Sequence, residues 1–304
     1  MDAVLKDLNQ QQKEAVLATE GPLLIIAGAG SGKTKALTHR IAHLISQGIG
    51  PENILAITFT NKAADEMRSR VRSLLSAKRE SPNDARFATD ALPYVGTFHA
   101  FCVRILRNEA TKLGFTKYFT IYDEDDSLGL LKETMKELDI NIKQFSPGMI
   151  GHMISRLKSE CIAPEAFEGK HSSEPFPQTV YKIYAQYQKH LMDANALDFD
   201  DLVMKAVELF ETHPDILETY QDRFRYIHVD EYQDTNTAQY RLVRLLAKKY
   251  RNLAVVGDDA QSIYSFRNAD FRNILNFEKD WPEAKIIILD ENYRSTKRIL
   301  DAAN

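Results

Sequence analysis

The sequence is poor in cysteine and tryptophan, with two Cys and one Trp among 304 residues. Cys102 and Cys161 lie far apart with no metal-ligand spacing around them, which argues against a disulfide framework and a cysteine-bound metal. No apolar run approaches the length of a membrane span, and the N-terminus lacks the basic and then apolar build of a signal peptide. These absences predict a cytoplasmic protein with reduced thiols and no membrane partner.

A large charge excess is also missing, because the net charge is −4. This value does not by itself indicate nucleic-acid binding. The distribution is more informative: residues 96–222 contain 13 Lys and Arg against 21 Asp and Glu, whereas each flank has a small positive excess. The middle of the chain therefore differs in composition from its flanks, and the length allows two folding units.

The most informative segment present is residues 27–34, which directly follow an apolar run and fit the phosphate-binding-loop pattern. Its glycines let backbone N–H groups point at phosphate oxygens. Lys33 would supply positive charge to the β- and γ-phosphates, and Thr34 would offer a hydroxyl to Mg²⁺. A glycine-rich turn is the alternative, but the strand pattern before it and the helix pattern after it favour nucleotide binding. The predicted nucleotide-binding loop consists of Ala27, Gly28, Ala29, Gly30, Ser31, Gly32, Lys33 and Thr34.

Short apolar, β-branched runs alternate with helical patterns in both flanks. The runs are almost continuously hydrophobic, as expected of strands buried on both faces. Their alternation with helices predicts an α/β fold with a parallel sheet and right-handed crossovers. The expected strands are residues 23–27, 54–59, 92–96, 226–229, 253–257 and 285–289, and the helices that follow several of them are 33–47, 61–75 and 237–249.

Residues from about 98 to 222 interrupt this alternation, because they contain few strand patterns and many helical ones. We therefore predict an acidic, all-helical domain inserted into the α/β domain. The expected helices are residues 100–113, 124–138, 147–160, 179–193 and 200–211.

Polar residues follow several predicted strands, and ligands bind at the carboxyl ends of strands in an open parallel sheet. Asp230 is predicted to hold Mg²⁺, directly or through water, and Glu231 to orient and deprotonate the attacking water. Gln261 could sense a γ-phosphate because its amide both donates and accepts hydrogen bonds. For the segment around Gln261 taken alone, a polar turn residue is the simpler interpretation.

Aromatic residues lie among polar ones at two further strand ends and near Phe266. Such a mixture suits unpaired nucleic-acid bases, because an aromatic ring stacks on any base. Core packing is the better explanation of each ring taken alone.

As a set, these segments resemble the motifs of UvrD/Rep/PcrA-type superfamily 1 DNA helicases, in order and spacing, over almost the whole chain. The resemblance covers residues 8–12 (an adenine-reading motif), 27–34 (the phosphate loop), 58–62 and 96–100 (strand-contacting motifs), 197–202, 230–236, 257–264 and 291–295.

The resemblance implies ATP and Mg²⁺ as cofactors, and single-stranded DNA and duplex junctions as partners. It implies that Gln12 reads the edge of an adenine ring sandwiched between Arg40 and Tyr293. It also implies that Gln261 and Arg294 contact the γ-phosphate. The implied catalytic residues are Lys33, Asp230, Glu231, Gln261 and Arg294, and the implied metal-binding residues are Thr34 and Asp230. The implied DNA path is lined by Phe59, Asn61, His99, Tyr264, Phe266 and Arg267.

The chain departs from the family in two respects. It has Ser-Phe-Arg-Asn at residues 265–268, where the family often has Arg-Trp-Arg-Gly, so base stacking should be somewhat weaker. It also ends at Asn304 inside a helical pattern, so we expect a longer protein. The predicted division is a discontinuous RecA-like, ATP-binding motor domain (1–97 and 223–289), an inserted helical accessory domain (98–222) and the start of a second motor domain (290–304).

The predicted function is that of an ATP-dependent 3′–5′ DNA helicase or single-stranded DNA translocase that acts as a monomer in repair or replication. The 304-residue portion is expected to be a poor ATPase and no helicase, because stepping needs two motor domains and the second would be a partner from the rest of the protein. The alternatives are the motor part of a recombination helicase-nuclease, an RNA-directed translocase, and a binding module that uses nucleotide only as a switch.

Overall fold

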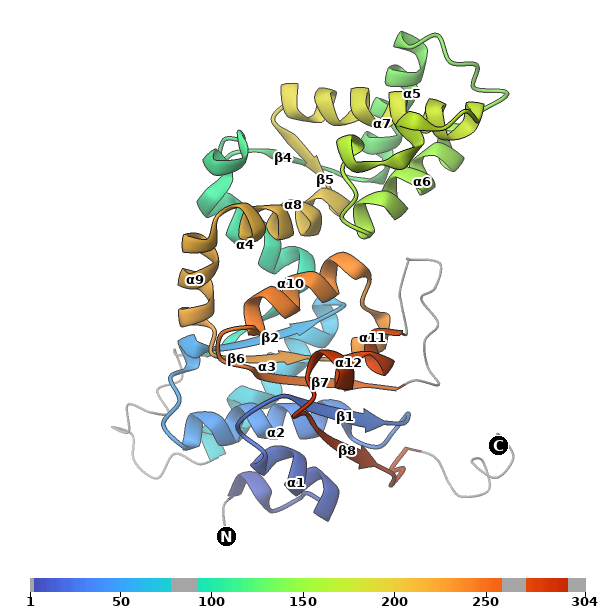
Figure 1. Ribbon diagram of the computed structural model, residues 1–304. Helices are drawn as coiled ribbons and strands as arrows, with labels where there is room; N and C mark the ends of the chain where they lie inside the picture. The colour runs from blue at the N-terminus through green and yellow to red at the C-terminus, as the bar shows by residue number, and fades with distance from the viewer. Residues whose placement is uncertain (1–2, 78–91, 259–271, 295–304) are drawn as a thin grey trace, which may run out of the picture. The chain divides into compact units, whose positions relative to one another are not determined.

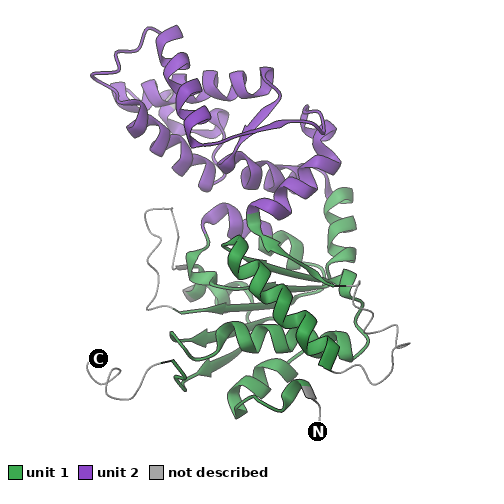
Figure 2. Ribbon diagram, turned by 180° about the vertical axis from the view of Figure 1, so that it is seen from behind, with its two compact units in different colours: residues 1–98, 215–235, 243–304 green, residues 99–214, 236–242 purple. Residues whose placement is uncertain are grey.

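The structure is a computed structural model that describes residues 3–77, 92–258 and 272–294. The chain divides into two compact units (Figure 2). Unit 1 comprises residues 1–98, 215–235 and 243–304, and unit 2 comprises residues 99–214 and 236–242. No helix among the described residues is long and apolar enough to cross a membrane.

Unit 1 is built on a six-stranded sheet with the order β3-β2-β6-β7-β1-β8, in which every neighbouring pair is parallel (Figure 1). Each of the six apolar runs forms a strand, so the predicted α/β class is confirmed. The carboxyl ends of β6, β7 and β1 lie at one edge of the sheet because these parallel strands are neighbours. The strands are β1 (Leu23–Ala27), β2 (Ile54–Thr58), β3 (Tyr94–Thr97), β6 (Tyr226–Val229), β7 (Asn252–Gly257) and β8 (Lys285–Leu289).

Helices α2 and α3 pack on one face of this sheet. Leu37 and Ile41 of α2 are four residues apart and therefore share one side of their helix, and they join the same buried cluster as Ile25 of β1. Met67 and Val71 repeat this spacing on α3. The helices wholly within unit 1 are α1 (Gln10–Leu17), α2 (Lys33–Ser46), α3 (Asn61–Ala77), α11 (Arg272–Leu275) and α12 (Phe277–Asp280), whereas the division between the units passes through α9 (Pro214–Arg223) and α10 (Thr237–Ala247).

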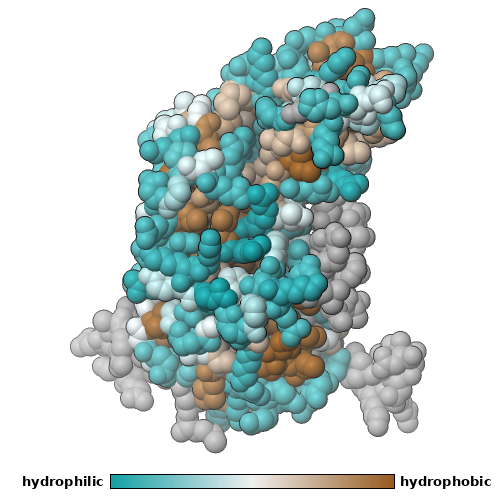
Figure 3. All heavy atoms as spheres, in the orientation of Figure 1, coloured by the Kyte–Doolittle hydropathy of each residue, from teal (hydrophilic) through white to brown (hydrophobic). Residues whose placement is uncertain are grey.

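Strand β8 forms an edge of the sheet and exposes apolar side chains. Ile286 and Ile288 are 36% and 59% exposed, and Leu17 at the end of α1 is 51% exposed. Hydrophobic residues are visible around this end of unit 1 in the space-filling view, on a face that is otherwise mostly hydrophilic (Figure 3).

Unit 2 is mainly helical, as expected, but it also contains a two-stranded parallel sheet. Strands β4 and β5 have three residues each, which is too short for a periodic pattern to be recognised in the sequence. Helix α7 begins four residues earlier than expected, because Pro175 occupies the first turn, where a missing N–H costs nothing. The elements are α4 (Phe98–Glu109, whose first residue belongs to unit 1), β4 (Thr120–Tyr122), α5 (Glu124–Glu137), α6 (Pro147–Ser159), α7 (Pro175–Asp193), β5 (Ala196–Asp198) and α8 (Phe199–Thr212).

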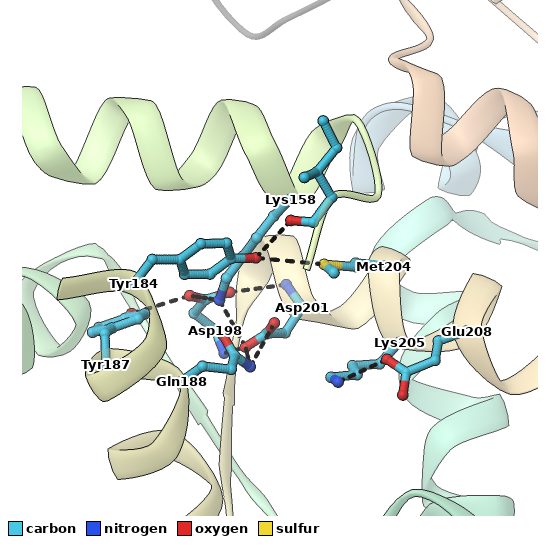
Figure 4. Close-up of polar contacts among 10 residues, drawn as sticks. Lys158, Tyr184, Tyr187, Gln188, Asp198, Asp201, Met204, Lys205 and Glu208 are labelled. Atoms are coloured by element: carbon cyan, nitrogen blue, oxygen red, sulfur yellow. Dashed lines mark hydrogen bonds and ion pairs between the residues drawn. The ribbon is translucent and has the colours of Figure 1, made fainter. Parts of the chain in front are cut away.

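A buried charged cluster ties together four elements of unit 2 (Figure 4). The Lys158 ammonium of α6 is fully buried and lies 2.6 Å from the Asp198 carboxylate of β5 and 2.9 Å from the Asp201 carboxylate of α8. From α7, the Tyr187 hydroxyl donates to Asp198 and the Gln188 amide donates to Asp201. We call these five residues the Lys158 cluster.

His228 of β6 is fully buried on the side of the sheet that faces α2. Burial and the nearby charge of Arg40 lower the pKa of His228 to about 3. At pH values below 6.5, the ordinary pKa of histidine, His228 therefore binds a proton in the unfolded chain but not in the folded one. The contribution of His228 to the free energy of unfolding is thus constant above pH 6.5 and falls as the pH drops below it, by up to about 1.4 kcal/mol per pH unit.

We predict that His228→Leu removes this part of the acid sensitivity. Between about pH 6 and pH 4, the free energy of unfolding of the wild type should fall relative to that of the variant by up to about 1.4 kcal/mol per pH unit. Urea denaturation at a series of pH values measures it, with His152→Leu as a control for loss of an exposed histidine. A difference that stays constant with pH would contradict the assignment.

Candidate functional site

The segment between β1 and α2 folds into a compact loop at the carboxyl end of β1. Ser31 closes the loop on itself, because its N–H and its hydroxyl donate to the Gly28 carbonyl at 3.2 and 2.7 Å. Gly32 precedes α2 in the left-handed region, with φ +88°, and no side chain caps the helix. The first N–H groups of α2 and the positive end of its dipole are therefore directed at the loop, an arrangement that favours an anion.

Position 32 disfavours a residue with a Cβ for two separate reasons. Its φ is strained for any residue with a Cβ, and a Cβ there would lie 2.5 Å from the amide nitrogen of Gln12. Gly48 offers a matched comparison, because its φ is +95° but a Cβ would meet no atom within 4 Å.

We predict that Gly32→Ala weakens nucleotide binding by about tenfold or more and lowers stability beyond the 1–2 kcal/mol cost of left-handed backbone. Gly48→Ala should show the backbone cost alone and leave nucleotide binding unchanged. Titration with a fluorescent ATP analogue and urea denaturation measure the two effects. Equal losses of affinity in both variants would show that the contact with Gln12 is irrelevant to the loop.

The phosphate loop and the acidic pair converge. The Lys33 ammonium lies 3.0 Å from a Glu231 carboxylate oxygen, and the Thr34 hydroxyl donates to the Asp230 carboxylate at 3.2 Å. These pairs join residues almost 200 positions apart in the sequence, and they form because β6 and β1 end at the same edge of the sheet. Lys33, Thr34, Asp230 and Glu231 therefore occupy one site.

Asp230 is buried, and its electrostatic surroundings suit a cation. Burial and then the adjacent charge of Glu231 raise the pKa of Asp230 to about 6, although the Thr34 hydroxyl and Lys33 oppose the shift. A divalent cation between Asp230 and Thr34 would relieve this penalty by favouring the carboxylate. No group of three His, Cys, Asp or Glu side chains suited to a metal occurs among the described residues.

Glu231 adopts a backbone conformation that is uncommon outside glycine, with φ +50°. Its N–H donates to the Asp230 carboxylate at 3.0 Å. One oxygen of its side chain accepts hydrogen bonds from both Lys33 and the amide of Gln233. Strain of this kind is commonly found at functional sites, where the surroundings hold a side chain in a defined direction.

The structure places Gln12 and Tyr293 next to the phosphate loop. Gln12 is buried; its amide donates to the Ser31 carbonyl at 3.0 Å and its side-chain oxygen accepts from the N–H of Asn9. Tyr293 is 61% exposed, its N–H donates to the Gly30 carbonyl at 2.9 Å, and its hydroxyl accepts from the Asn9 amide. An exposed ring in this position is accessible to a nucleotide base.

Arg40 is placed differently from Tyr293, because it is only 1% exposed. Its guanidinium donates to the carbonyls of Ala15, Ala18 and Thr19 and so supports the end of α1. Burial lowers the pKa of Arg40 to about 10, and the residue still carries its charge at neutral pH. Its predicted stacking on adenine stays a prediction, and its hydrogen bonds add a structural role that the sequence did not suggest.

The segment after β8 is bonded to the phosphate loop. The Asn292 amide donates to the Ala29 carbonyl at 2.6 Å, and the Asn292 side-chain oxygen accepts from the N–H of Arg294. Arg294 is exposed and lies close to Gly30, where a Cβ would be 2.5 Å from that of Arg294. Arg294, which is predicted to contact the γ-phosphate, thus lies beside the phosphate loop.

Sequence reasoning missed two residues in this region. Asn9 caps α1, and its side chain and that of Gln12 each accept a hydrogen bond from the other residue's backbone N–H. The spacing of Asn9 and Gln12, three positions apart, is typical of such a capping box and could have indicated this role from the sequence. Asn292 lies in a motif that was recognised, but nothing local in the sequence indicates its long-range bond to the loop.

The residues predicted to line a DNA path are only partly described. Phe59 follows β2 and packs edge-to-face with Phe98 at 5.5 Å between ring centroids, and Asn61 is exposed at the start of α3. His99 belongs to unit 2, where its ring lies 5.7 Å from that of Phe199. These roles stay predictions. Gln261, Tyr264, Phe266 and Arg267 lie outside the described residues.

A parallel sheet with a phosphate loop after β1 and an acidic pair after β6 defines the class of P-loop nucleotide-binding folds. Within this class, the family described as the UvrD/REP helicase N-terminal domain matches residues 8–282, and the chain belongs to that family. The chain is 52% identical over 305 residues to proteins named ATP-dependent DNA helicase PcrA from Staphylococcus epidermidis and Staphylococcus aureus. These alignments cover 100% of this chain and 40% of the length of each relative.

Proposed function

We propose that the chain is the Mg·ATP-binding first motor portion of an ATP-dependent DNA helicase. The observation that supports this proposal is the convergence of Lys33, Thr34, Asp230 and Glu231 at the ends of β1 and β6. Lys33 binds the β- and γ-phosphates, Thr34 and Asp230 hold Mg²⁺, and Glu231 orients and deprotonates the attacking water. Bound Mg²⁺ supplies the charge that stabilises the phosphates during transfer.

The remaining roles form part of the same proposal. Gln12 and Tyr293 contact the adenine, and Arg294 contacts the γ-phosphate. Residues 1–97 and 223–289 act as a motor domain, residues 98–222 as an accessory domain on the path of single-stranded DNA, and residues 290–304 as the start of a second motor domain. The whole protein moves 3′ to 5′ as a monomer, in repair or replication.

We predict that the 304-residue chain binds Mg·ATP, hydrolyses it slowly and unwinds no duplex. Stepping requires two motor domains that close on ATP and reopen after hydrolysis, and this chain supplies one wall of that cleft. ATP hydrolysis with and without single-stranded DNA or RNA, together with a strand-displacement assay, tests the prediction. Processive unwinding by this chain, or failure to bind Mg·ATP, would contradict the proposal, and stimulation by RNA alone would contradict its DNA substrate.

A further inference from the structure

Gln233 is a buried side chain whose amide joins two strand ends at the nucleotide site. It lies in the short 3₁₀ turn Tyr232–Asp234 and is 2% exposed. Its nitrogen donates to the Glu231 carboxylate at 2.8 Å and more weakly to Asp234 at 3.4 Å. Its oxygen accepts the N–H of Asp258, the residue after β7, at 3.1 Å.

These partners fix the orientation of the amide. The Asp258 N–H can only donate and the Glu231 carboxylate can only accept, so oxygen and nitrogen cannot exchange places. The turn also approaches β7 closely, since a Cβ on Gly257 would lie 3.0 Å from the Gln233 side-chain oxygen. Gln233 is therefore a fixed bridge between the backbone at the end of β7 and the carboxylate after β6.

Glu231 needs such support because its side chain is long and 37% exposed. It has two donors among the described contacts, Lys33 and Gln233, and both bind the same carboxylate oxygen. Nucleotide phosphates would compete with Glu231 for Lys33, whereas Gln233 is buried and neutral, and its amide is bonded to Glu231 and Asp258. Gln233 is thus the donor whose hydrogen bond to Glu231 would persist when nucleotide binds.

We propose that Gln233 is a positioning residue for ATP hydrolysis, holding the Glu231 carboxylate where it orients the attacking water. This inference rests on the proposed function of the site. It assigns to Gln233 no contact with nucleotide or metal.

The test uses Gln233→Met, which retains the length of the side chain but neither hydrogen bond. Single-turnover hydrolysis of Mg·ATP at excess protein should slow by about tenfold or more, because a small displacement of a catalytic group has effects of this size. The protein concentration that gives half the maximal single-turnover rate should stay within about threefold, because Gln233 touches no nucleotide. The matched control is Gln221→Met, since Gln221 is also a buried glutamine of unit 1 and donates to the Leu245 carbonyl at 2.7 Å.

Gln233→Glu supplies a second readout that a purely structural role would not produce. A carboxylate at this position cannot donate to Glu231 and repels it, but a protonated carboxyl group has both a donor and an acceptor and restores the two bonds. Burial and the neighbouring carboxylates would raise the pKa of the introduced group. Relative to wild type, the hydrolysis rate of Gln233→Glu should therefore rise as the pH falls from about 8 to about 6.

Slow hydrolysis in Gln233→Met with unchanged hydrolysis in Gln221→Met, and recovery of Gln233→Glu at lower pH, are the expected results. Equal slowing in both Met variants, or a Gln233→Met rate equal to wild type, would overturn the positioning role and leave the proposed function intact. Wild-type protein that binds Mg·ATP but never hydrolyses it would overturn both.

Discussion

Replacing Glu231 with glutamine is expected to slow Mg·ATP hydrolysis by about 10²–10⁴-fold, the contribution of a positioned general base. Glutamine keeps the shape of the side chain but cannot take a proton from water. Nucleotide binding should be retained or slightly tightened, because loss of the carboxylate leaves Lys33, now 3.0 Å from it, free to pair with phosphate. Single-turnover hydrolysis and titration with a fluorescent ATP analogue measure the two quantities separately.

Glu66→Gln is the matched control for this experiment. Glu66 is an exposed carboxylate on α3 of the same unit, 3.7 Å from Arg70 in a surface ion pair, and its loss should change neither quantity. A Glu231→Gln variant that hydrolyses ATP as fast as wild type would show that Glu231 is not the base. A wild-type chain with tight nucleotide binding and no turnover to lose would instead support the switch alternative.

Replacing Lys158 with methionine is expected to lower the free energy of unfolding by about 3–5 kcal/mol, the usual effect of removing one partner of a buried ion pair. Although burial opposes its charge, Asp198 and Asp201 raise the pKa of Lys158 above its ordinary value, so the ammonium stays protonated. Without it, two carboxylates of the Lys158 cluster are left facing each other in the interior. Urea denaturation followed by circular dichroism measures the loss.

Two further variants separate charge from packing in the Lys158 cluster. Changing Lys158→Met together with Asp198→Asn and Asp201→Asn removes all three charges and should recover most of the stability. Asp198 is the N-cap residue of α8, and Asn can also fill that position. Lys205→Met breaks an ion pair with Glu208 on α8 whose carboxylate is partly exposed, and it should cost less than about 1 kcal/mol. A single Lys158→Met variant as stable as Lys205→Met would refute a charged cluster.

The parts of this molecule that were predictable from sequence are those governed by local rules. Residues 27–34 predicted the phosphate loop because few other functions require glycines, Lys and Thr at that spacing. The buried strands of unit 1 were recognisable because a parallel sheet covered on both faces needs continuous apolar runs. The meeting of Lys33 with Glu231 followed from topology, since parallel strands place their carboxyl ends together.

The parts that escaped prediction depend on long-range contacts or on very short elements. Lys158 and Asp198 are 40 residues apart, and no local pattern in the sequence indicates that their side chains meet. The burial of Arg40 could not be foreseen, because arginine is rarely buried and its carbonyl partners lie at the end of α1 and directly after it. Strand β4, with three residues, carries too few positions for any alternation to be recognised.

The bond from the Tyr293 N–H to the Gly30 carbonyl, reinforced by Asn292 on Ala29, has a mechanical consequence. After β8, the polypeptide is hydrogen-bonded to the phosphate loop at Gly30 and Ala29. A force applied at Arg294 would therefore act on these two bonds before it acts on the pairing of β8 with β1. The segment from Asp290 to Arg294 thus connects β8 directly to the phosphate loop.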